Sequence, residues 1–307
     1  MLSVSKLDRI SLSLSVPKNI YWPVDAQFTA LSKYLGVPLK KRFLGKGSNI
    51  KIGRSISISI GEQTLRMAVC RYMKSTWISY EFNNSIDTAA FEGLIAPLMM
   101  EASLYNAMTF GRLKHMELSI DYFGLDSNDY LFHNVGVKSS YIIWNEAKTG
   151  ASHYMGSAKS QLQLVAYDKN QHLLDSGLPA YAGKVMRIEA RINSIKSSLV
   201  EWMHNLGAID PFQGFIVCKR NNASLFKTDV PYWSTFLGRC TEVGVAAALA
   251  ESPSKKTFLS YLEKLKDSRF HIDPLKFSGA LHKMIDTDLL LETWAGQGFS
   301  WCEDVCN

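Results

Sequence analysis

A tyrosine and a lysine, Tyr167 and Lys169, stand two positions apart at the end of LQLVAYDKN, a segment with the composition of a β-strand. Residues two apart in an extended strand point to the same side, so we expect the two side chains to share a face. A phenol can act as a nucleophile, and a nearby ammonium offers a positive charge to a phosphate. The pair predicts phosphate chemistry at Tyr167, with packing in a core as the alternative.

Two further segments carry charged residues at alternating positions. These residues are Glu117 and Asp121 in one segment and Arg187, Glu189 and Arg191 in the other. If the three segments are neighbouring strands, one face of a sheet collects acidic, basic and phenolic groups. Carboxylates on one side of a strand repel each other unless a cation or an arginine lies between them, which favours a functional face. The alternative is a solvated outer face with cross-strand ion pairs.

Alternation of apolar and polar residues predicts the strands that position these groups. Such strands are expected at residues 56–60, 116–122 and 185–192. The period of two is typical of half-buried strands in antiparallel sheets. Apolar residues at helical spacing predict helices at residues 25–35, ended by Gly36, and at 86–108, divided by Pro97. We therefore expect an α+β fold, with an antiparallel-sheet-rich core and flanking helices.

The sequence becomes mainly helical from about Ser194 onwards. Helices are expected at residues 197–206, after the N-cap Ser252, and at residues 286–294. We predict an α+β catalytic core at residues 1–195, made of two related sheet halves at about 1–110 and 111–195. A mainly helical C-terminal region then covers residues 196–307.

Composition limits the class of protein. The 307 residues are 47% hydrophobic and 20% charged, which is typical of a globular protein. No apolar run reaches the roughly 18 residues of a membrane span, and no signal sequence is recognisable, so we expect a cytoplasmic protein without a membrane partner. The five scattered cysteines are expected to be free thiols and do not form a zinc motif. The net charge of +6 permits a polyanionic partner.

Three motifs together resemble those of a known family. MELSIDYFG, HYMGSAKSQLQLVAYDKN and VMRIEARIN resemble, in order and spacing, the motifs of rolling-circle replication initiators of small plasmids and filamentous phages. The group in question lacks the His-hydrophobic-His metal motif, and none of the seven histidines here forms such a pair. The resemblance covers roughly residues 50–195. The sequence departs from it at Glu117, where the family often has aspartate, and at His172, where an acidic residue frequently stands.

The resemblance implies a DNA nicking-closing endonuclease and strand transferase. Tyr167 would attack a phosphodiester at a replication origin and form a 5′-phosphotyrosine intermediate, with Lys169 offsetting phosphate charge. Tyr122, Tyr154 and Tyr181 are alternative tyrosines nearby. The metal ligands would be Glu117, Asp121 and Glu189, which suit Mg²⁺ or Mn²⁺. The DNA-binding residues would be Arg187, Arg191, Ser157 and Lys159.

The expected partner is origin DNA, both duplex and single-stranded. A host helicase, a host polymerase and a second copy of the chain are further candidate partners. Two other interpretations stay open. One is a non-catalytic, sequence-specific DNA-binding regulator on the same fold. The other is a carboxylate-based hydrolase with Glu117 and Glu189 as acid and base.

Overall fold

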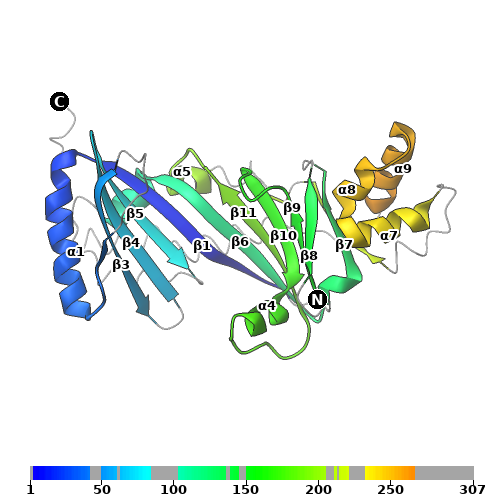
Figure 1. Ribbon diagram of the computed structural model, residues 1–307, viewed down its shortest axis with the longest axis horizontal. Helices are drawn as coiled ribbons and strands as arrows, with labels where there is room; N and C mark the ends of the chain where they lie inside the picture. Colours follow the sequence, from blue (N-terminus) through cyan, green and yellow to red (C-terminus); the bar gives the residue numbers. More distant parts are fainter. Residues whose placement is uncertain are drawn as a thin grey trace. The chain divides into compact units, whose positions relative to one another are not determined.

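The computed structural model describes most of the first 266 residues (Figure 1). The described residues are 3–41, 50–60, 63–83, 103–135, 139–144, 150–204, 211–212, 214–220 and 232–266. Contacts between residues divide them into two compact units. The N-terminal unit contains the described residues within 7–114 and 195–206, and the Tyr167 unit those within 1–6, 115–194 and 207–276. The predicted boundary near residue 195 between a core and a C-terminal region stays a prediction.

The N-terminal unit contains an antiparallel sheet with the strand order β2-β3-β4-β5-β1. The predicted strand at 56–60 is confirmed as part of β3. The alternation there buries Ile56 and Ile58 on one side and leaves Ser57 and Ser59 exposed on the other. The strands are β1 (Ser3–Val16), β2 (Lys40–Lys41), β3 (Ile50–Ile60), β4 (Gln63–Tyr72) and β5 (Thr76–Asn83).

Helix α1 packs against β3 and β4 of this sheet (Figure 1). It buries Phe28 and Leu31 and ends at Gly36, whose φ of 65° is readily adopted only by glycine. The predicted helix at 25–35 is thus confirmed, although it begins earlier. Of the helix predicted at 86–108, residues 86–102 lie outside the described part. The helices of this unit are η1 (Lys18–Ile20), α1 (Tyr21–Leu35), α3 (Leu104–Thr109) and α5 (Leu199–His204).

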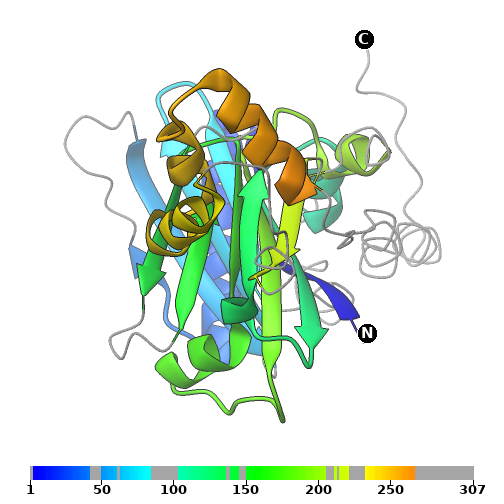
Figure 2. The same ribbon diagram turned by 90° about the vertical axis from the view of Figure 1, so that its right-hand side faces the viewer.

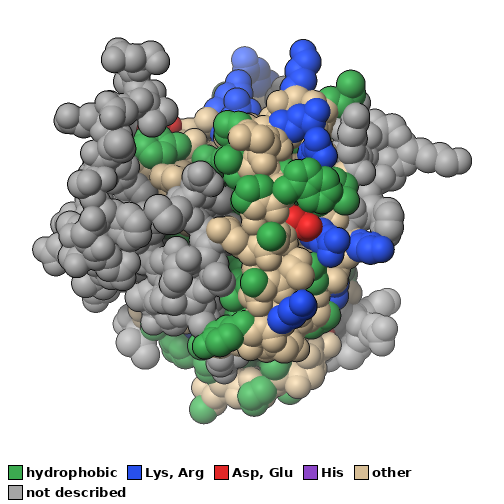
Figure 3. All heavy atoms as spheres, turned by 90° about the vertical axis from the view of Figure 1, so that its left-hand side faces the viewer, with side chains coloured by type: hydrophobic (Ala, Val, Ile, Leu, Met, Phe, Trp, Pro, Cys, Tyr) green, Lys and Arg blue, Asp and Glu red, His purple; other side chains and the backbone are tan. Residues whose placement is uncertain are grey.

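The face of the molecule seen in Figure 3 shows lysine and arginine side chains beside hydrophobic ones. Trp22, Lys33 and Tyr34 are exposed, and the Arg71 guanidinium lies 5.6 Å from the centre of the Trp22 ring. Asp25, the acidic residue of this helix, is buried.

The Tyr167 unit contains a second antiparallel sheet, with the strand order β6-β11-β10-β9-β8. In this unit, as in the N-terminal unit, the first strand pairs with the last, and the preceding strands follow outwards in reverse order. The strands predicted at 116–122 and 185–192 are confirmed as parts of β6 and β11. The strands are β6 (Arg112–Phe123), β8 (Ser140–Trp144), β9 (Ala151–Met155), β10 (Leu162–Asp168) and β11 (Val185–Asn193).

Helices α7, α8 and α9 and a two-stranded sheet form a further part of the Tyr167 unit (Figures 1 and 2). Phe236 and Tyr261 stack at their centre, with ring centroids 4.2 Å apart. The elements are η3 (Ser127–Asp129), β7 (Tyr130–Asn134), β12 (Phe215–Lys219), α7 (Trp233–Val243), α8 (Val245–Ala250) and α9 (Lys255–Lys266).

In the C-terminal region the structure adds one strand that was not predicted and corrects one helix N-cap. β12 is a strand within a stretch predicted to be mainly helical; it pairs with β7. The N-cap of α9 is Ser254 and not Ser252, because the Thr257 N–H donates to Ser254 Oγ at 3.1 Å. The helix predicted at 286–294 lies outside the described residues.

The structure confirms the predicted α+β fold class. Antiparallel sheets and separate groups of helices make up both units. Within the described part of the chain, no helix is both long and apolar enough to span a bilayer. Cys70, Cys218 and Cys240 are free thiols, as expected, whereas Cys302 and Cys306 lie outside the described residues.

Candidate active site

Cross-strand pairing brings the predicted polar residues to one side of the Tyr167 unit's sheet, which we call the polar face. Arg187 of β11 pairs with Tyr167 of β10 on one side and with Asp121 of β6 on the other. The next rows of the face are Val165, Glu189 and Ser119, and then Gln163, Arg191 and Glu117. The strands predicted from alternation are therefore neighbours, in a register that places all of these side chains together.

The centre of the polar face is buried, which excludes a solvated outer surface for the residues there. Asp121, Arg187 and Glu189 are buried, and Tyr167 is only 7% exposed. Charged groups that are removed from water require partners of opposite charge or hydrogen bonds. The partners of each group therefore decide what this face can do.

Asp121 and Arg187 form a bidentate ion pair. Arg187 Nε donates to Asp121 Oδ1 at 2.5 Å, and Arg187 Nη2 donates to Oδ2 at 2.7 Å. Lys6 Nζ lies 3.2 Å from the same Oδ2. Burial alone raises the pKa of Asp121, but the hydrogen bonds and charges of Arg187 and Lys6 outweigh it and hold that pKa below its ordinary value. As a metal ligand, Asp121 would have to share both oxygens with Arg187.

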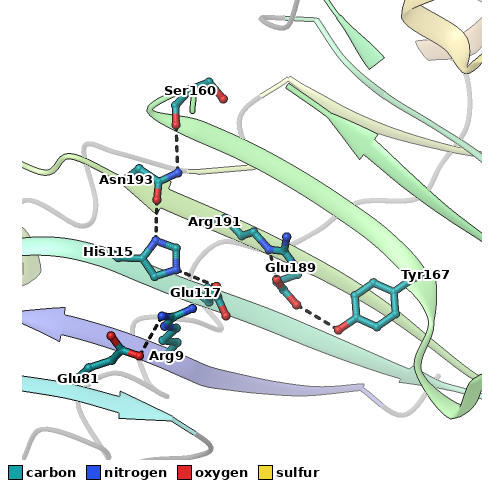
Figure 4. A network of polar contacts seen from close by, with 9 residues as sticks. All are labelled: Arg9, Glu81, His115, Glu117, Ser160, Tyr167, Glu189, Arg191 and Asn193. Carbon is teal, nitrogen blue, oxygen red and sulfur yellow. Dashed lines mark hydrogen bonds and ion pairs between the residues drawn. The ribbon is translucent and has the colours of Figure 1, made fainter. Parts of the chain in front are cut away.

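Tyr167 and Glu189 form the second contact of the face (Figure 4). Tyr167 Oη donates a hydrogen bond to Glu189 Oε2 at 3.1 Å. Arg191 Nε donates to the other oxygen, Oε1, at 2.5 Å. One carboxylate therefore joins the candidate nucleophile to a guanidinium.

Glu117 belongs to a third group that the sequence did not indicate (Figure 4). Its Oε1 lies 2.7 Å from His115 Nε2, and His115 Nδ1 lies 2.6 Å from Asn193 Oδ1. The Asn193 amide then donates to the Ser160 carbonyl at 3.1 Å. A signal was present, because His115 and Glu117 stand two positions apart on one strand and so share a face.

Lys169 does not lie on the strand with Tyr167, and the expectation that they share a strand face is wrong. β10 ends at Asp168, and Lys169 is the first residue of α4 (Lys169–Asp175). The Asp168 carboxylate accepts hydrogen bonds from the N–H groups of Asn170 and Gln171, which caps the helix and ends the strand. The lysine still lies close to the polar face, because its charge acts on His172 of the same helix.

His172 packs against the candidate nucleophile. Its ring meets the Tyr167 ring edge-on, with centroids 5.3 Å apart. Burial, together with the charge of Lys169, lowers the pKa of His172, although Glu189 opposes this shift. A neutral imidazole beside the phenol at neutral pH follows from this arrangement.

The predicted DNA-binding residues Ser157 and Lys159 lie in the tight turn between β9 and β10, and both are exposed. The turn requires glycine at position 156 for two reasons. Its φ of 97° is unfavourable for other residues, and a Cβ at this position would lie 2.9 Å from the Leu162 carbonyl oxygen. The Lys159 N–H donates to Ser157 Oγ at 3.2 Å. The turn thus presents a lysine at the start of β10, whereas Tyr167 lies near the other end of that strand.

The three predicted metal ligands do not converge on one point. No group of three or more His, Cys, Asp or Glu side chains in the described part of the chain is arranged to hold a metal ion. Asp121, Glu117 and Glu189 instead contact Arg187, His115 and Arg191, respectively. Between them, the hydroxyl of Ser119 is buried without a hydrogen-bond partner. These residues do not fit a three-carboxylate metal centre as arranged, and their role as ligands stays a prediction.

The solved structures that are similar to this chain include one that carries the expected family name. The chain is similar to the rolling circle replication initiator protein from Geobacillus stearothermophilus. The two are 13% identical, the alignment covers 88% of this chain and 99% of that chain, and the TM-score is 0.41. The di-domain ARO/CYC StfQ from the steffimycin biosynthetic pathway aligns over 87% of this chain and 98% of its own, at 9% identity and a TM-score of 0.15.

No family model matches the chain, and no curated protein matches it. At the identities and TM-scores of the solved structures, similarity alone carries no argument about function. Function is therefore argued from the motifs and from the geometry of the polar face.

Proposed function

We propose that the protein initiates rolling-circle replication by nicking and rejoining one DNA strand through a covalent bond to Tyr167. The observation that carries the proposal is the hydrogen bond of 3.1 Å from Tyr167 Oη to Glu189 Oε2. A phenol with a pKa near 10 is a poor nucleophile at neutral pH unless a base accepts its proton. Glu189 stands where such a base is needed, within hydrogen-bond reach of the phenol.

The proposed reaction exchanges one phosphate ester for another. Tyr167 Oη bonds to phosphorus while its proton passes to Glu189 Oε2. The bond from phosphorus to the 3′-oxygen breaks, and that oxygen takes a proton from water. The products are a 5′-phosphotyrosine and a free 3′-hydroxyl that a polymerase can extend. The reverse reaction, with a 3′-hydroxyl as nucleophile, reseals a strand without ATP because the ester bond is conserved.

The cations around the phenol support phosphate binding in this proposal. Arg187 lies directly opposite Tyr167 on the neighbouring strand, and Lys169 begins the helix that follows. Arg191 contacts Glu189 and keeps about a third of its side chain exposed. Guanidinium and ammonium groups stabilise the negative charge of a phosphoryl group in the transition state.

Dependence on Mg²⁺ or Mn²⁺ remains part of the proposal, but no step is assigned to the ion. In this arrangement Asp121 and Glu189 each pair with an arginine, and Glu117 contacts the His115 imidazole. A bound divalent cation would polarise the phosphate if these carboxylates rearranged around DNA.

The test is a covalent adduct. The protein is incubated with single-stranded origin oligonucleotides, with Mn²⁺ and separately with EDTA, and the products are separated on a denaturing gel. We expect a protein–DNA adduct that is lost in Tyr167→Phe and retained in Tyr181→Phe, an exposed alternative tyrosine between α4 and β11. Mass spectrometry of the adduct should identify Tyr167. An adduct that survives in Tyr167→Phe would contradict the proposal.

A second candidate function is supported by one observation. Arg187 and Arg191 hold Asp121 and Glu189 in ion pairs, an arrangement that also suits a DNA-binding regulator that has lost turnover. Origin binding without any adduct, in either metal condition, would support this regulator. Glycoside hydrolysis without origin binding would instead support the carboxylate-based hydrolase.

A further inference from the structure

A pair of stacked tyrosines lies on the polar face beside the candidate nucleophile. Tyr141 of β8 pairs with Tyr154 of β9, which pairs with Val165 of β10, which in turn pairs with Glu189 of β11. The two tyrosines therefore stand in the same cross-strand row as Glu189. With strands about 4.8 Å apart, two and three steps place them roughly 10 and 14 Å along the sheet from the Glu189 backbone.

The geometry of this pair is that of a stack of flat rings. The ring centroids of Tyr141 and Tyr154 are 4.7 Å apart, and the ring planes differ by only 4°. Gln163 Nε2 holds the Tyr141 hydroxyl at 3.3 Å and is itself tied to the Gly156 carbonyl at 3.0 Å. The orientation of the Tyr141 ring is thus set by the β10 strand that carries the nucleophile.

Tyr141 is not a core residue. Its side chain is 39% exposed, on the outermost strand of the sheet order. In the described part of the chain, the Tyr154 ring stacks on one side of the Tyr141 ring. An exposed ring that already stacks on one neighbour can take a second flat group on its other side.

The charges around the pair favour a nucleic acid as that flat group. Arg191 lies on the same face, in the cross-strand row next to that of Tyr154. Lys159 is exposed in the turn that directly follows β9. Stacked aromatic rings flanked by cations are the common design of proteins that bind single strands. Bases inside a duplex are already stacked on both sides, so a duplex does not fit.

We propose that Tyr141, supported by Tyr154, is a stacking platform for a base of the single DNA strand that Tyr167 attacks. The proposal rests on the proposed function for its choice of strand. At about 3.4 Å per stacked nucleotide, the platform holds a base within about four nucleotides of the attacked phosphate. It would hold the strand in place on the side of β8 and leave the phosphate at β10.

The first test measures binding of a fluorescein-labelled oligothymidylate of about 16 nucleotides by fluorescence anisotropy. We expect Tyr141→Leu to weaken binding by about 5- to 150-fold, the range for one stacked base. Tyr141→Phe keeps the ring and should stay within about twofold of wild type. Trp144→Leu is the matched control, because Trp144 is 40% exposed on the other side of the same strand.

The outcomes separate the platform from a general effect on the fold. Wild-type affinity in Tyr141→Leu overturns the proposal. An equal loss in Trp144→Leu, or an equal loss of duplex binding in Tyr141→Leu, also overturns it, because damage to β8 would then explain the result. Circular dichroism of each variant confirms that the compared proteins are folded.

The adduct assay separates this proposal from the proposed function. If both are right, Tyr141→Leu forms less adduct at low DNA concentration and recovers at high concentration. If wild type forms no adduct but Tyr141→Leu still loses single-strand affinity, the nicking reaction is wrong and the platform stands. If the adduct depends on Tyr167 but not on Tyr141 at any DNA concentration, the platform is wrong and the reaction stands.

Discussion

Breaking the ion pair between Asp121 and Arg187 should destabilise the protein strongly. The Asp121 side chain is 0% exposed and that of Arg187 is 5% exposed. Arg187→Met keeps the apolar stem but leaves a buried carboxylate without its bidentate partner. Loss of one partner of a buried ion pair costs about 3 to 5 kcal/mol of the free energy of unfolding. Lys6 remains 3.2 Å from Asp121, so we expect the lower end, about 3 kcal/mol.

The assay is urea unfolding followed by circular dichroism, with the double variant Arg187→Met/Asp121→Leu completing a thermodynamic cycle. With a slope of about 3 kcal/mol per molar urea, the midpoint of Arg187→Met should fall by about 1 M. The double variant replaces both charges with apolar groups, and such replacements are often close to neutral. The matched control is Lys6→Met, which removes a partly exposed cation and should cost no more than about 1 kcal/mol.

Two results would refute the reasoning behind this prediction. A cost below about 1 kcal/mol in Arg187→Met would mean that Asp121 finds water or another partner. Strictly additive costs in the double variant would mean that the two side chains do not stabilise each other.

The remaining predictions concern the phenol, the turn, the buried hydroxyl and acid pH. Glu189→Gln should reduce the rate of adduct formation by about 100-fold or more, measured in single turnover, because the amide cannot accept the proton; an unchanged rate would exclude Glu189 as base. Gly156→Ala should destabilise the protein more than Gly177→Ala in urea unfolding. Both glycines have positive φ, but of the two only Gly156 would place its added Cβ within 4 Å of other backbone atoms. Ser119→Ala should be neutral or stabilise by about 1 kcal/mol, since it removes an unpaired buried hydroxyl; a clear loss would indicate a bound water or ion there. Burial lowers the pKa of His133 to about 4 from 6.5, and burial together with the Arg220 charge does the same for His153. Between pH 4 and 6.5 the unfolded chain therefore binds more protons than the folded chain, so the free energy of unfolding should fall as the pH drops from about 6.5 to about 4. The dependence of that free energy on pH should be weaker in His153→Phe.

The faces of the strands could be predicted from the sequence because alternation has a simple physical cause. Successive side chains of a strand point to opposite sides, so Glu189 and Arg191 had to share a face wherever β11 lay. That Tyr167 lies opposite Arg187, and Arg187 opposite Asp121, depends on register. Alternation alone does not determine which strands are neighbours, and here the order of the motifs supplied that expectation.

The burial of the polar face could not be predicted from the alternation. A pattern of apolar and polar residues distinguishes two sides of a strand but does not say whether the polar side meets water. The ion pairs that make burial tolerable, such as Arg187 with Asp121, are visible only after the strands are paired. The carboxylates that were predicted to share a metal ion each contact a different side chain, and this explains why three separate contacts were found.

The short helix α4 was missed although its signal is present. Asp168 and Gln171 stand at the spacing of an N-terminal capping motif, and the Asp168 carboxylate does accept two helix N–H groups. The period of the preceding strand was extended through Lys169 because seven residues are too few for a helical pattern to be visible. Lys169 therefore follows the strand of Tyr167 as the first residue of a helix, and its role in the site stays a prediction.

The pairing of β10 on both of its edges limits how this chain can change in length. β10 hydrogen-bonds to β9 on one side and β11 on the other, so it cannot slide without breaking both sets of bonds. One residue inserted between Leu162 and Tyr167 would rotate the phenol to the far side of the sheet. The exposed residues 176–184, by contrast, connect α4 to β11 outside either strand, so insertions and deletions in related sequences should collect there and be absent from β10.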